Sequence, residues 1–277
     1  MRIVTVGDAC CDCYLHEGVW YPGGQALNVA VNALYDGAEE AAFLGILGDD
    51  TRGARLRELG EAEGVDFSRC RWVLAPTSYW GVRIVEGDRH FEDRAQECLD
   101  EIIGLRISRA DRAYVNGFDV CHITNEAGVD ASIAKLHEQA LVSYDYSVYA
   151  WEDEAWVAAT APQVDIAFLS GELEDGTPLA EDAIVSFARR MHGLGSQLVV
   201  CTRGSHGSLC SYRGELYRGG IVPVEVADTM GAGDSFAAAF LVRWLDSGEV
   251  DEALAFAAER AAHTCTLHGA WGHPQPL

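Results

Sequence analysis

Seven residues, Asp-Thr-Met-Gly-Ala-Gly-Asp at 228–234, combine a turn of small residues with two carboxylates. They follow a strand-like apolar run at 221–226 and lead into a helix-like apolar stretch at 235–245. Gly231, Ala232 and Gly233 therefore fall where the first turn of a helix begins, and the free backbone N–H groups of such a turn bind anions. Asp234, at the edge of this anion site, is placed to take a proton from a hydroxyl that attacks phosphorus. The motif indicates phosphoryl transfer to an alcohol.

A helix N-cap in a tight turn is the alternative interpretation, because Asp favours the cap position and an isolated Gly-x-Gly-Asp is a weak signal. The longer pattern and its strand–turn–helix setting favour the chemical interpretation. Lysine occurs once, at Lys135, and the chain has no Gly-Lys-Ser or Gly-Lys-Thr. This excludes a Walker-type phosphate loop, so a kinase built on this sequence must hold its phosphates without that lysine.

The length of 277 residues is enough for one large α/β domain with an appendage or for two small domains, and we expect a single domain that spans residues 1–277. The formal net charge of −23 argues against binding to nucleic acids or anionic membranes, because both require a basic face. No apolar run approaches the roughly 20 residues of a membrane span, and residues 1–7 resemble a first β-strand rather than a signal peptide. With nine scattered cysteines read as reduced thiols, the sequence predicts a cytoplasmic protein.

Strand-like and helix-like segments alternate along the chain, which predicts a mostly parallel sheet covered by helices on both faces. The expected strands are 3–6, 41–47, 114–115, 141–144, 166–169, 198–201 and 221–226. The expected helices are 25–35, 51–63, 126–139, 180–194, 235–245 and 251–267. Two segments do not follow this alternation of strands and helices. Residues 12–20 are a short stretch of mixed polar and apolar residues, and residues 78–94 have the pattern of a hairpin around Glu86-Gly87-Asp88. Together they predict a small antiparallel sheet that projects from the main body.

Three further regions resemble those of one kinase family. Residues 23–30, Gly-Gly-Gln-Ala-Leu-Asn-Val-Ala, with Leu-Gly-Ile-Leu-Gly-Asp-Asp at 44–50, are similar to the N-terminal signature of the ribokinase-like (PfkB) carbohydrate kinases. The 228–234 motif resembles their C-terminal signature, and the opening Val6-Gly7-Asp8 to Asp12 resembles their first strand and substrate turn. The matches stand in the family's order over nearly the whole chain. The resemblance implies a ribokinase-like fold with a small β lid built from segments 12–20 and 78–94.

Within the family, the chain looks most like the fructoselysine 6-kinase branch. The similarity lies in Gly-Asp-Ala-Cys-Cys-Asp-Cys-Tyr at 7–14, in 143–147 and 228–236, and in His-Gly-Ala-Trp at 268–271. This resemblance implies an acceptor that is a glycated amino acid, phosphorylated at O6 of its sugar part. The lid residues expected to contact the amino-acid part are Tyr14, Tyr79, Trp80, Arg83 and Arg94; ordinary faces of a small sheet are the alternative.

By resemblance, Asp234 is the general base, and Gly231, Ala232 and Gly233 supply the N–H groups that receive the γ-phosphoryl group. The residues expected to hold the sugar hydroxyls are Asp12, Gly23, Gly24 and Asn28. The turn expected to bind the nucleotide contains Thr202, Arg203, Gly204 and Gly207. A helical Asn28 that only packs, and a simple β-turn at 204–207, are the corresponding structural alternatives.

ATP and Mg²⁺ are the implied cofactors, with K⁺ as a further expectation. The family's Asn-x-x-Glu, which positions Mg²⁺ through water, is not intact here, since the region reads Ser-Gly-Glu-Leu-Glu at 170–174. Glu174 is preferred to Glu172 as its replacement, and a surface carboxylate without a role is the alternative. A monovalent cation would lie near Asp228, held by carbonyl groups of that segment and of 268–271.

The sequence thus predicts an ATP-dependent sugar kinase whose acceptor is O6 of a fructosamine such as fructoselysine. Kinases for fructose, ribose or adenosine-like nucleosides are the alternatives within the family, and a non-catalytic sugar- or nucleotide-binding regulator is an alternative outside it. A thiol- or metal-dependent protein built on Cys10, Cys11 and Cys13 is a third hypothesis. The expected partners are small molecules, together with a second copy of the chain bound through the lid.

Overall fold

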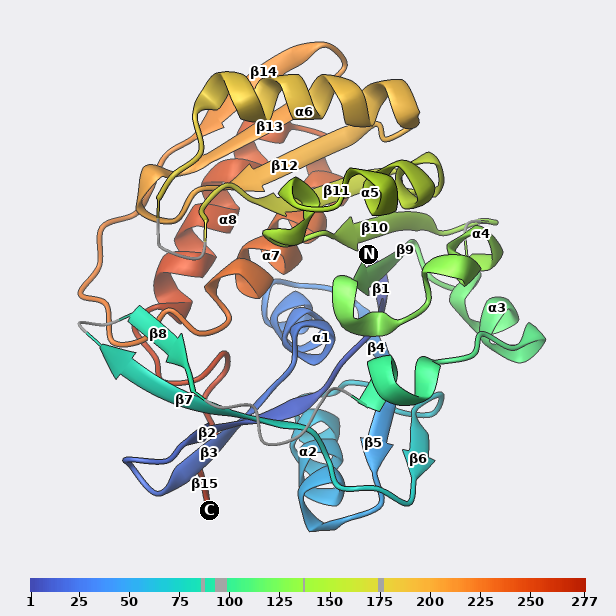
Figure 1. Cartoon of the computed structure of the whole chain (residues 1–277), viewed down its shortest axis with the longest axis vertical. Helices are drawn as coiled ribbons and strands as arrows, with labels where there is room; N and C mark the ends of the chain where they lie inside the picture. The colour runs from blue at the N-terminus through green and yellow to red at the C-terminus, as the bar shows by residue number, and fades with distance from the viewer. Residues whose placement is uncertain (86–87, 93–98, 137, 174–176) are drawn as a thin grey trace.

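In the computed structural model, which describes residues 1–85, 88–92, 99–136, 138–173 and 177–277, an eight-stranded sheet runs through the centre (Figure 1). Its order is β14-β13-β12-β11-β10-β9-β1-β4. The six strands from β12 to β4 are parallel, whereas β13 and β14 are antiparallel additions at one edge. The strands are β1 Arg2–Val6, β4 Glu40–Leu44, β9 Val120–Thr124, β10 Leu141–Asp145, β11 Ile166–Ser170, β12 Leu198–Thr202, β13 Ser208–Tyr212 and β14 Glu215–Gly219.

Helices cover both faces of this sheet, as the alternating pattern predicts. One face carries α1 Gln25–Tyr35, α2 Thr51–Ala62, α7 Ala232–Ser247 and α8 Val250–Thr264. The other carries α3 Arg109–Val115, α4 Ile133–Leu136, α5 Glu154–Thr160 and α6 Glu181–Leu194. Short helical turns lie between them: η1 Asp100–Gly104, η2 Asn125–Ala127, η3 Asp130–Ser132, η4 Tyr149–Trp151, η5 Ala161–Gln163 and η6 Gly204–His206. No helix in the described ranges is both long and apolar enough to span a membrane.

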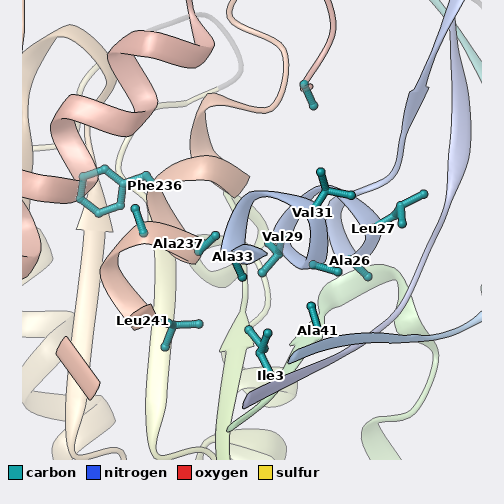
Figure 2. Packing of buried hydrophobic residues seen from close by; sticks show 14 of the residues in the cluster. Ile3, Ala26, Leu27, Val29, Val31, Ala33, Ala41, Phe236, Ala237 and Leu241 are labelled. Carbon is teal, nitrogen blue, oxygen red and sulfur yellow. The ribbon is translucent and has the colours of Figure 1, made fainter. Parts of the chain in front are cut away.

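Helix α1 is the central helix of the first face. Its side chains pack toward Ile3 and Ala41 of the sheet and toward Ala237 and Leu241 of α7 (Figure 2). Small residues dominate this contact, so the backbones of α1 and α7 approach closely. The packing therefore sets the position of the N-terminal end of α1 relative to that of α7.

A second, five-stranded sheet, here called the small sheet, lies beside the main body (Figure 1). Its order is β15-β3-β2-β7-β8, with bounds Gln275–Pro276, Val19–Gly23, Cys10–Tyr14, Tyr79–Val85 and Asp88–Phe91. The two segments predicted to pair therefore do so, although β2 and β7 run parallel and the C-terminal strand β15 was not anticipated. Residues 86–87 and 93–94 of the predicted hairpin lie outside the described residues. A third, two-stranded sheet joins β5 Ile46–Gly48 to β6 Arg71–Val73.

Two expected strands are wrong. Residues 114–115 close helix α3, and the strand of that region is β9, where the polar His122 interrupts the apolar run. Residues 221–226 form no strand; they run as an irregular segment in which Ile221 is 53% exposed and Val226 44% exposed. The apolar, β-branched composition of 221–226 predicts burial, but β14 is already the edge of the sheet and this segment leaves it toward the 228–234 motif.

The helix predicted at 126–139 is mostly absent. The region consists of two 3₁₀ turns and the four-residue helix α4. Gly128, at φ +63°, adopts the left-handed conformation that ends a helical turn. The single expected strand at 41–47 is likewise two strands, β4 and β5, which separate at Gly45. A Cβ on Gly45 would lie 2.2 Å from the carbonyl oxygen of Gly7, so the chain bends there against the β1 turn.

Asp50 joins α2 to the root of strand β7. Its Oδ1 accepts from the N–H of Gly53 at 2.8 Å, which caps the helix, and from the hydroxyl of Thr77 at 2.6 Å. Its Oδ2 accepts from the N–H of Thr77 at 2.9 Å. Burial alone would raise the pKa of Asp50, but the hydrogen bonds from Thr77 and Gly53 outweigh it and lower that pKa below the ordinary 3.8.

We therefore expect Asp50→Ala to lower the free energy of unfolding by about 1–2 kcal/mol, as for other N-cap losses. Because the pKa of Asp50 is lower in the folded state, its contribution is present above pH 3.8 and fades as the pH falls through the folded value. Urea titrations at pH 7 and at acid pH measure this. The neighbouring exposed Asp49→Ala is the control; an equal loss in both variants would contradict the assignment.

Candidate active site

The 228–234 motif ends at the N-terminus of helix α7, as expected. Gly231 is the N-cap residue and adopts φ +73°, and a Cβ there would lie 2.3 Å from the Cβ of Ala270. Both the backbone conformation and the space therefore require glycine. Gly233, two residues on, is exposed, and a Cβ on it would meet nothing within 4 Å. The first turn of α7 thus opens to solvent at Gly233, which leaves room for an anion over the helix N-terminus.

Asp234 occupies the third position of the helix and is only 9% exposed. Its Oδ2 accepts a hydrogen bond from Nδ2 of Asn28 on α1 at 2.8 Å. The Oδ1 of Asn28 in turn accepts from the indole N–H of Trp271 at 3.0 Å. Residues from three distant parts of the sequence are therefore joined side chain to side chain. The carboxylate is held in a buried position beside the open helix end, where a general base would have to lie.

Asp228, at the other end of the motif, is completely buried. Its Oδ2 accepts from the hydroxyl of Tyr14 in strand β2 and, at 2.9 Å, from the N–H of Gly269. Its Oδ1 accepts from the N–H of Met230 at 2.9 Å. Asp228 thus connects the small sheet, the 228–234 motif and the C-terminal loop. Burial, together with Asp228, raises the pKa of Tyr14 far above its ordinary value, so its hydroxyl stays a donor.

Asp12 lies in strand β2 and is 3% exposed. Its Oδ1 accepts from Sγ of Cys10 at 3.7 Å, while Oδ2 is buried and has no hydrogen-bond partner among the described residues. A Cβ on Gly23 would lie 2.1 Å from this Oδ2, so glycine is needed opposite it. Burial, with the negative charges of Asp8 and Asp234, raises the pKa of Asp12 to about 7. The structure thus places an unsatisfied carboxyl group, with glycine opposite it, in the region where the sugar was predicted to bind.

Asp8 is a further buried carboxylate near this site, and the sequence did not predict a role for it. It follows β1 and accepts from the N–H groups of Gln25 and Ala26 at 3.1 and 3.4 Å, which caps the start of α1. It also accepts from the hydroxyl of Thr124 at the end of β9, at 3.4 Å. Gly24, just before α1, has φ +97°, and a Cβ there would lie 2.5 Å from the Cα of Ala9. Asp8 and Gly24 therefore determine where helix α1 begins, and hence where Asn28 lies.

The predicted nucleotide turn follows strand β12 at the carboxyl edge of the parallel sheet, the usual ligand edge of such sheets. Thr202 ends the strand and Arg203 begins the turn. Gly204 and Gly207 adopt positive φ values of +48° and +80°. A Cβ on Gly207 would lie 2.3 Å from the carbonyl oxygen of Gly219. Nε of Arg203 is buried without a hydrogen-bond partner in the described structure.

The structure places the carboxylate of Glu172 at this turn. Its carboxylate atoms lie 2.5–2.7 Å from where a Cβ on Gly204 would be. Glu174 lies outside the described residues. The strand-end position of Glu172, directly after Ser170 and Gly171, was visible in the sequence, but its contact with Gly204 depends on the pairing of β11 with β12.

The predicted lid contacts divide between two faces of the small sheet. Tyr14 is fully buried and bonded to Asp228, so it forms part of the framework rather than a substrate surface. Tyr79 packs toward the main body with the guanidinium of Arg52 4.9 Å from its ring centre, and Arg83 pairs with Glu92. Trp80 is the strand neighbour of Asp12 in the register of β2 and β7. Arg94 lies outside the described residues.

A residue not predicted from sequence, Phe91 on β8, accompanies Trp80. The two rings lie 5.3 Å apart between centres, and Phe91 is 53% exposed. Because Phe91 pairs with Val82, and Val82 packs with Tyr14 and Met230, the aromatic pair belongs to the face of the small sheet that carries Asp12.

The cysteine cluster has a structural role in this arrangement. Cys11 and Cys13 belong to the apolar core beneath the small sheet. Burial raises the pKa of both thiols, and a metal or a nucleophilic reaction would need the thiolate. Among the described residues, no group of three or more His, Cys, Asp or Glu side chains is arranged to hold a metal ion. The structure therefore offers no support for a thiol- or metal-dependent protein built on these residues.

Comparisons with known proteins assign this fold to a class of phosphotransferases with an alcohol acceptor. The family model described as pfkB family carbohydrate kinase matches residues 8–276. Fructosamine kinase FrlD of Bacillus subtilis is 32% identical over 277 residues, covering all of this chain and 95% of that protein. Fructoselysine 6-kinase of Escherichia coli K12 is 31% identical over 271 residues, covering 97% and 99%. Among solved structures, Arabidopsis thaliana ribokinase complexed with ribose and ATP superposes with a TM-score of 0.79 at 21% identity, covering 97% of this chain and 93% of that one.

The chain therefore belongs to the pfkB family of carbohydrate kinases, and its architecture is ribokinase-like. It is an ATP-dependent carbohydrate kinase.

The buried carboxyl group of Asp12 predicts a pH-dependent cost in stability. In the unfolded chain Asp12 ionises near 3.8, whereas in the fold it keeps its proton up to about pH 7. The free energy of unfolding therefore falls as the pH rises through this window and levels off above it. Asp12→Asn, which resembles the protonated form, should raise the melting temperature of the ligand-free protein, by an amount that grows from pH 4 to pH 7.

Differential scanning calorimetry at several pH values between 4 and 8 checks this, with the exposed Asp49→Asn as the control. A gain in melting temperature that is the same at every pH, or a loss, would show that Asp12 is not a strained, desolvated carboxyl group.

Proposed function

We propose that this kinase transfers the γ-phosphoryl group of ATP to O6 of a fructosamine such as fructoselysine, with Asp234 as the general base. The observation that carries the proposal is the buried Asp234 at the third position of α7, held by Asn28 beside a helix N-terminus that is open at Gly233. A base and an anion site thus lie within one helical turn. Phosphoryl transfer to a hydroxyl requires this combination and little other protein chemistry.

In this proposal Asp234 accepts the proton of the acceptor hydroxyl as the hydroxyl oxygen bonds to the γ-phosphorus of ATP, and the bond from that phosphorus to the bridging oxygen breaks to release ADP. The N–H groups of Gly231 and Gly233 stabilise the charge on the transferred group, and one such donor is worth about 3 kcal/mol in the transition state. The N–H of Ala232 donates to the carbonyl oxygen of Thr229 at 3.3 Å in the structure, so it joins them only when that bond is exchanged for one to the phosphoryl group. ATP, when bound, supplies the phosphoryl group, and Mg²⁺ neutralises its phosphate oxygens. Hydrogen bonds of this kind take the place of the absent Walker lysine.

We assign the nucleotide phosphates to the turn that contains Thr202, Arg203, Gly204 and Gly207. The positive φ values of its two glycines turn the backbone tightly, which suits close approach by a phosphate. The guanidinium of Arg203 provides a positive charge there. We assign the outer-shell contact to Mg²⁺ to Glu172, because its carboxylate packs against Gly204 of the same turn.

A K⁺ ion near Asp228 fits less well. Three protein donors, the Tyr14 hydroxyl and the N–H groups of Met230 and Gly269, already bind the buried carboxylate of Asp228. A monovalent cation in this region would therefore have backbone carbonyl groups as its ligands. No step of the proposed reaction depends on such an ion.

The charge of the site favours a cationic acceptor. Asp8, Asp12, Asp228 and Asp234 are all buried, and the charges of the other three each raise the pKa of Asp12. A fructosamine carries a secondary ammonium group, which this cluster would attract, whereas fructose and ribose are neutral. The names of the two full-length relatives point to the same substrate class.

We propose that the small sheet acts as the lid over the acceptor, with Trp80 and Phe91 on the face that carries Asp12. Exclusion of water by a lid protects ATP from hydrolysis, and aromatic faces attract ammonium groups. A homodimer through the small sheet stays a prediction; its outer strands, β8 and β15, are where a second copy would pair.

A kinase for a neutral sugar such as fructose is the second candidate, because the unsatisfied Oδ2 of Asp12 suits sugar hydroxyls as well as a cation. The acceptor panel that separates the two contains fructoselysine, glucoselysine, fructose, ribose and adenosine. We expect kcat/KM for fructoselysine to exceed that for fructose by at least about tenfold, the factor that corresponds to 1.4 kcal/mol.

The most informative control is an analogue of fructoselysine in which an ether oxygen replaces the secondary amine. It keeps the length and the hydroxyl groups but lacks the positive charge. We expect a loss of kcat/KM of about tenfold or more. Equal rates for the analogue and fructoselysine would contradict the electrostatic argument, and phosphorylation of unmodified sugars alone would contradict the proposed acceptor.

Two glycine variants test the anion site without disturbing the fold. Gly233 and Gly193 both lie in helices, both are exposed, and a Cβ on either meets nothing within 4 Å. Gly→Ala at either position should keep or slightly raise stability. Only Gly233→Ala should lower kcat, by about tenfold or more, because its methyl group occupies the space assigned to the phosphoryl group. Steady-state kinetics and thermal melts measure both effects; unchanged turnover in Gly233→Ala would refute the site.

Asp234→Asn tests the base itself. We expect it to bind ATP normally by calorimetry and to lose nearly all turnover, by a factor of about 100 or more, since the amide cannot accept the proton. A variant that retains full turnover would show that another group is the base.

A further inference from the structure

The side-chain amide of Asn28 lies between one obligatory donor and one carboxylate. Its Oδ1 accepts from Nε1 of Trp271 at 3.0 Å, and its Nδ2 donates to Oδ2 of Asp234 at 2.8 Å. The two ends of an amide have nearly the same shape, so packing alone does not decide which end faces Asp234. An indole N–H can only donate, and it therefore requires the oxygen end. Trp271 thereby turns the N–H₂ group of Asn28 toward the carboxylate.

We propose that Trp271 is a positioning residue that acts through Asn28 to orient Asp234 and keep it ionised. The inference rests on the proposed role of Asp234 as the base. If the amide were flipped, its oxygen would face the carboxylate, and the buried carboxylate of Asp234 would lose the hydrogen bond from Asn28, which favours its charged form. Asp234 would then be both less well oriented and more readily protonated.

The loop that carries Trp271 is anchored independently of this contact. The N–H of Gly269 binds Asp228, and Gly269 adopts φ +69° with its Cβ position against the ring of Tyr21. Trp271 is 4% exposed. The loop should therefore keep its place when only the indole N–H is removed, and Trp271→Phe tests the hydrogen bond rather than the loop.

The expected result for Trp271→Phe is a fall in kcat of roughly tenfold to a hundredfold, with the KM for ATP unchanged. The acid limb of the pH profile of kcat should move to higher pH, because loss of a donated hydrogen bond favours the protonated carboxyl group. Among the described residues, the ionisable groups coupled to Asp234 are Asp12 and, through Asp12, Asp8, Asp228 and Tyr14. The substitution alters none of them.

Trp156→Phe is the matched control. Its indole N–H donates to Oδ2 of Asp130 at 2.8 Å on the other face of the main sheet, so its loss should leave the pH profile unchanged. A double-mutant cycle with Asn28→Ala provides the decisive comparison. If Trp271 acts through Asn28, Trp271→Phe should cost much less in the Asn28→Ala background than alone.

Additive losses, or a loss of kcat without a shift of the acid limb, would overturn the inference and leave Trp271 a packing residue. If Trp271→Phe does not fold, the indole N–H signal of ¹⁵N-labelled native protein serves instead. It should titrate with pH in the native chain but not in Asp234→Asn, and a signal that does not titrate in the native chain would overturn the inference. A failure of the proposed function would show itself differently: Asp234→Asn would then retain turnover, whatever the result for Trp271→Phe.

Discussion

The hydrogen bond from Asn28 to Asp234 joins α1 to α7, and the geometry of the site depends on it. The two helices pack on the same face of the central sheet through small side chains, which brings their N-terminal ends together. Asp8 and Gly24 determine where α1 begins, and Gly231 determines where α7 begins. Asn28 and Asp234 each lie near the beginning of their helices. A small change in the position where α1 or α7 begins would therefore separate the two side chains. The positive-φ glycines and the Asp8 cap are therefore requirements of the site as much as of the fold.

Electrostatics connects this geometry to the choice of substrate. Four buried aspartates lie at one end of the sheet. Burial raises the pKa of Asp12, and the charges of the other three aspartates raise it further. Hydrogen bonds offset the charge at Asp8, Asp228 and Asp234, whereas Oδ2 of Asp12 has no hydrogen-bond partner in the part of the chain that the structure describes. Binding sites commonly reduce the stability of the ligand-free protein, because their groups are arranged to complement a ligand rather than one another. A hydroxyl-rich, positively charged acceptor supplies both the donors and the charge that this cluster lacks.

Much of the fold could be predicted from the sequence, because the spacing of apolar residues indicates which face of each helix or strand is buried. Helix α1 has the predicted bounds, and β10, β11 and β12 differ from the prediction by a residue or so. The failures have physical causes. The polar His122 interrupts the apolar run of β9, so the strand was not predicted. Residues 221–226 have the composition of a strand, but this segment leaves the edge strand β14 toward the 228–234 motif. The C-terminal strand β15 is two residues long and carries a proline, which no local pattern marks as a strand.

The site was only partly predictable, for a different reason. Asp12, Asn28, Asp228 and Asp234 were singled out because their motifs are local, and the structure brings them into one region. Contacts between distant residues leave no local trace: Trp271 lies 243 residues from Asn28, and Tyr14 lies 214 residues from Asp228. For this reason the sequence predicted Tyr14 as a substrate contact, whereas in the structure it is a buried residue that binds Asp228. Spacing alone does not place Glu172 at Gly204, because that contact depends on the pairing of β11 with β12.

The most direct test of the central claim is a crystal structure with a non-hydrolysable ATP analogue, Mg²⁺ and fructoselysine. We expect the O6 hydroxyl to lie within hydrogen-bond distance of the Asp234 carboxylate, with the γ-phosphate over the N–H groups of 231–233 and the substrate ammonium near Asp12. A complex in which another hydroxyl faces Asp234, or in which the γ-phosphate lies away from the α7 N-terminus, would contradict it.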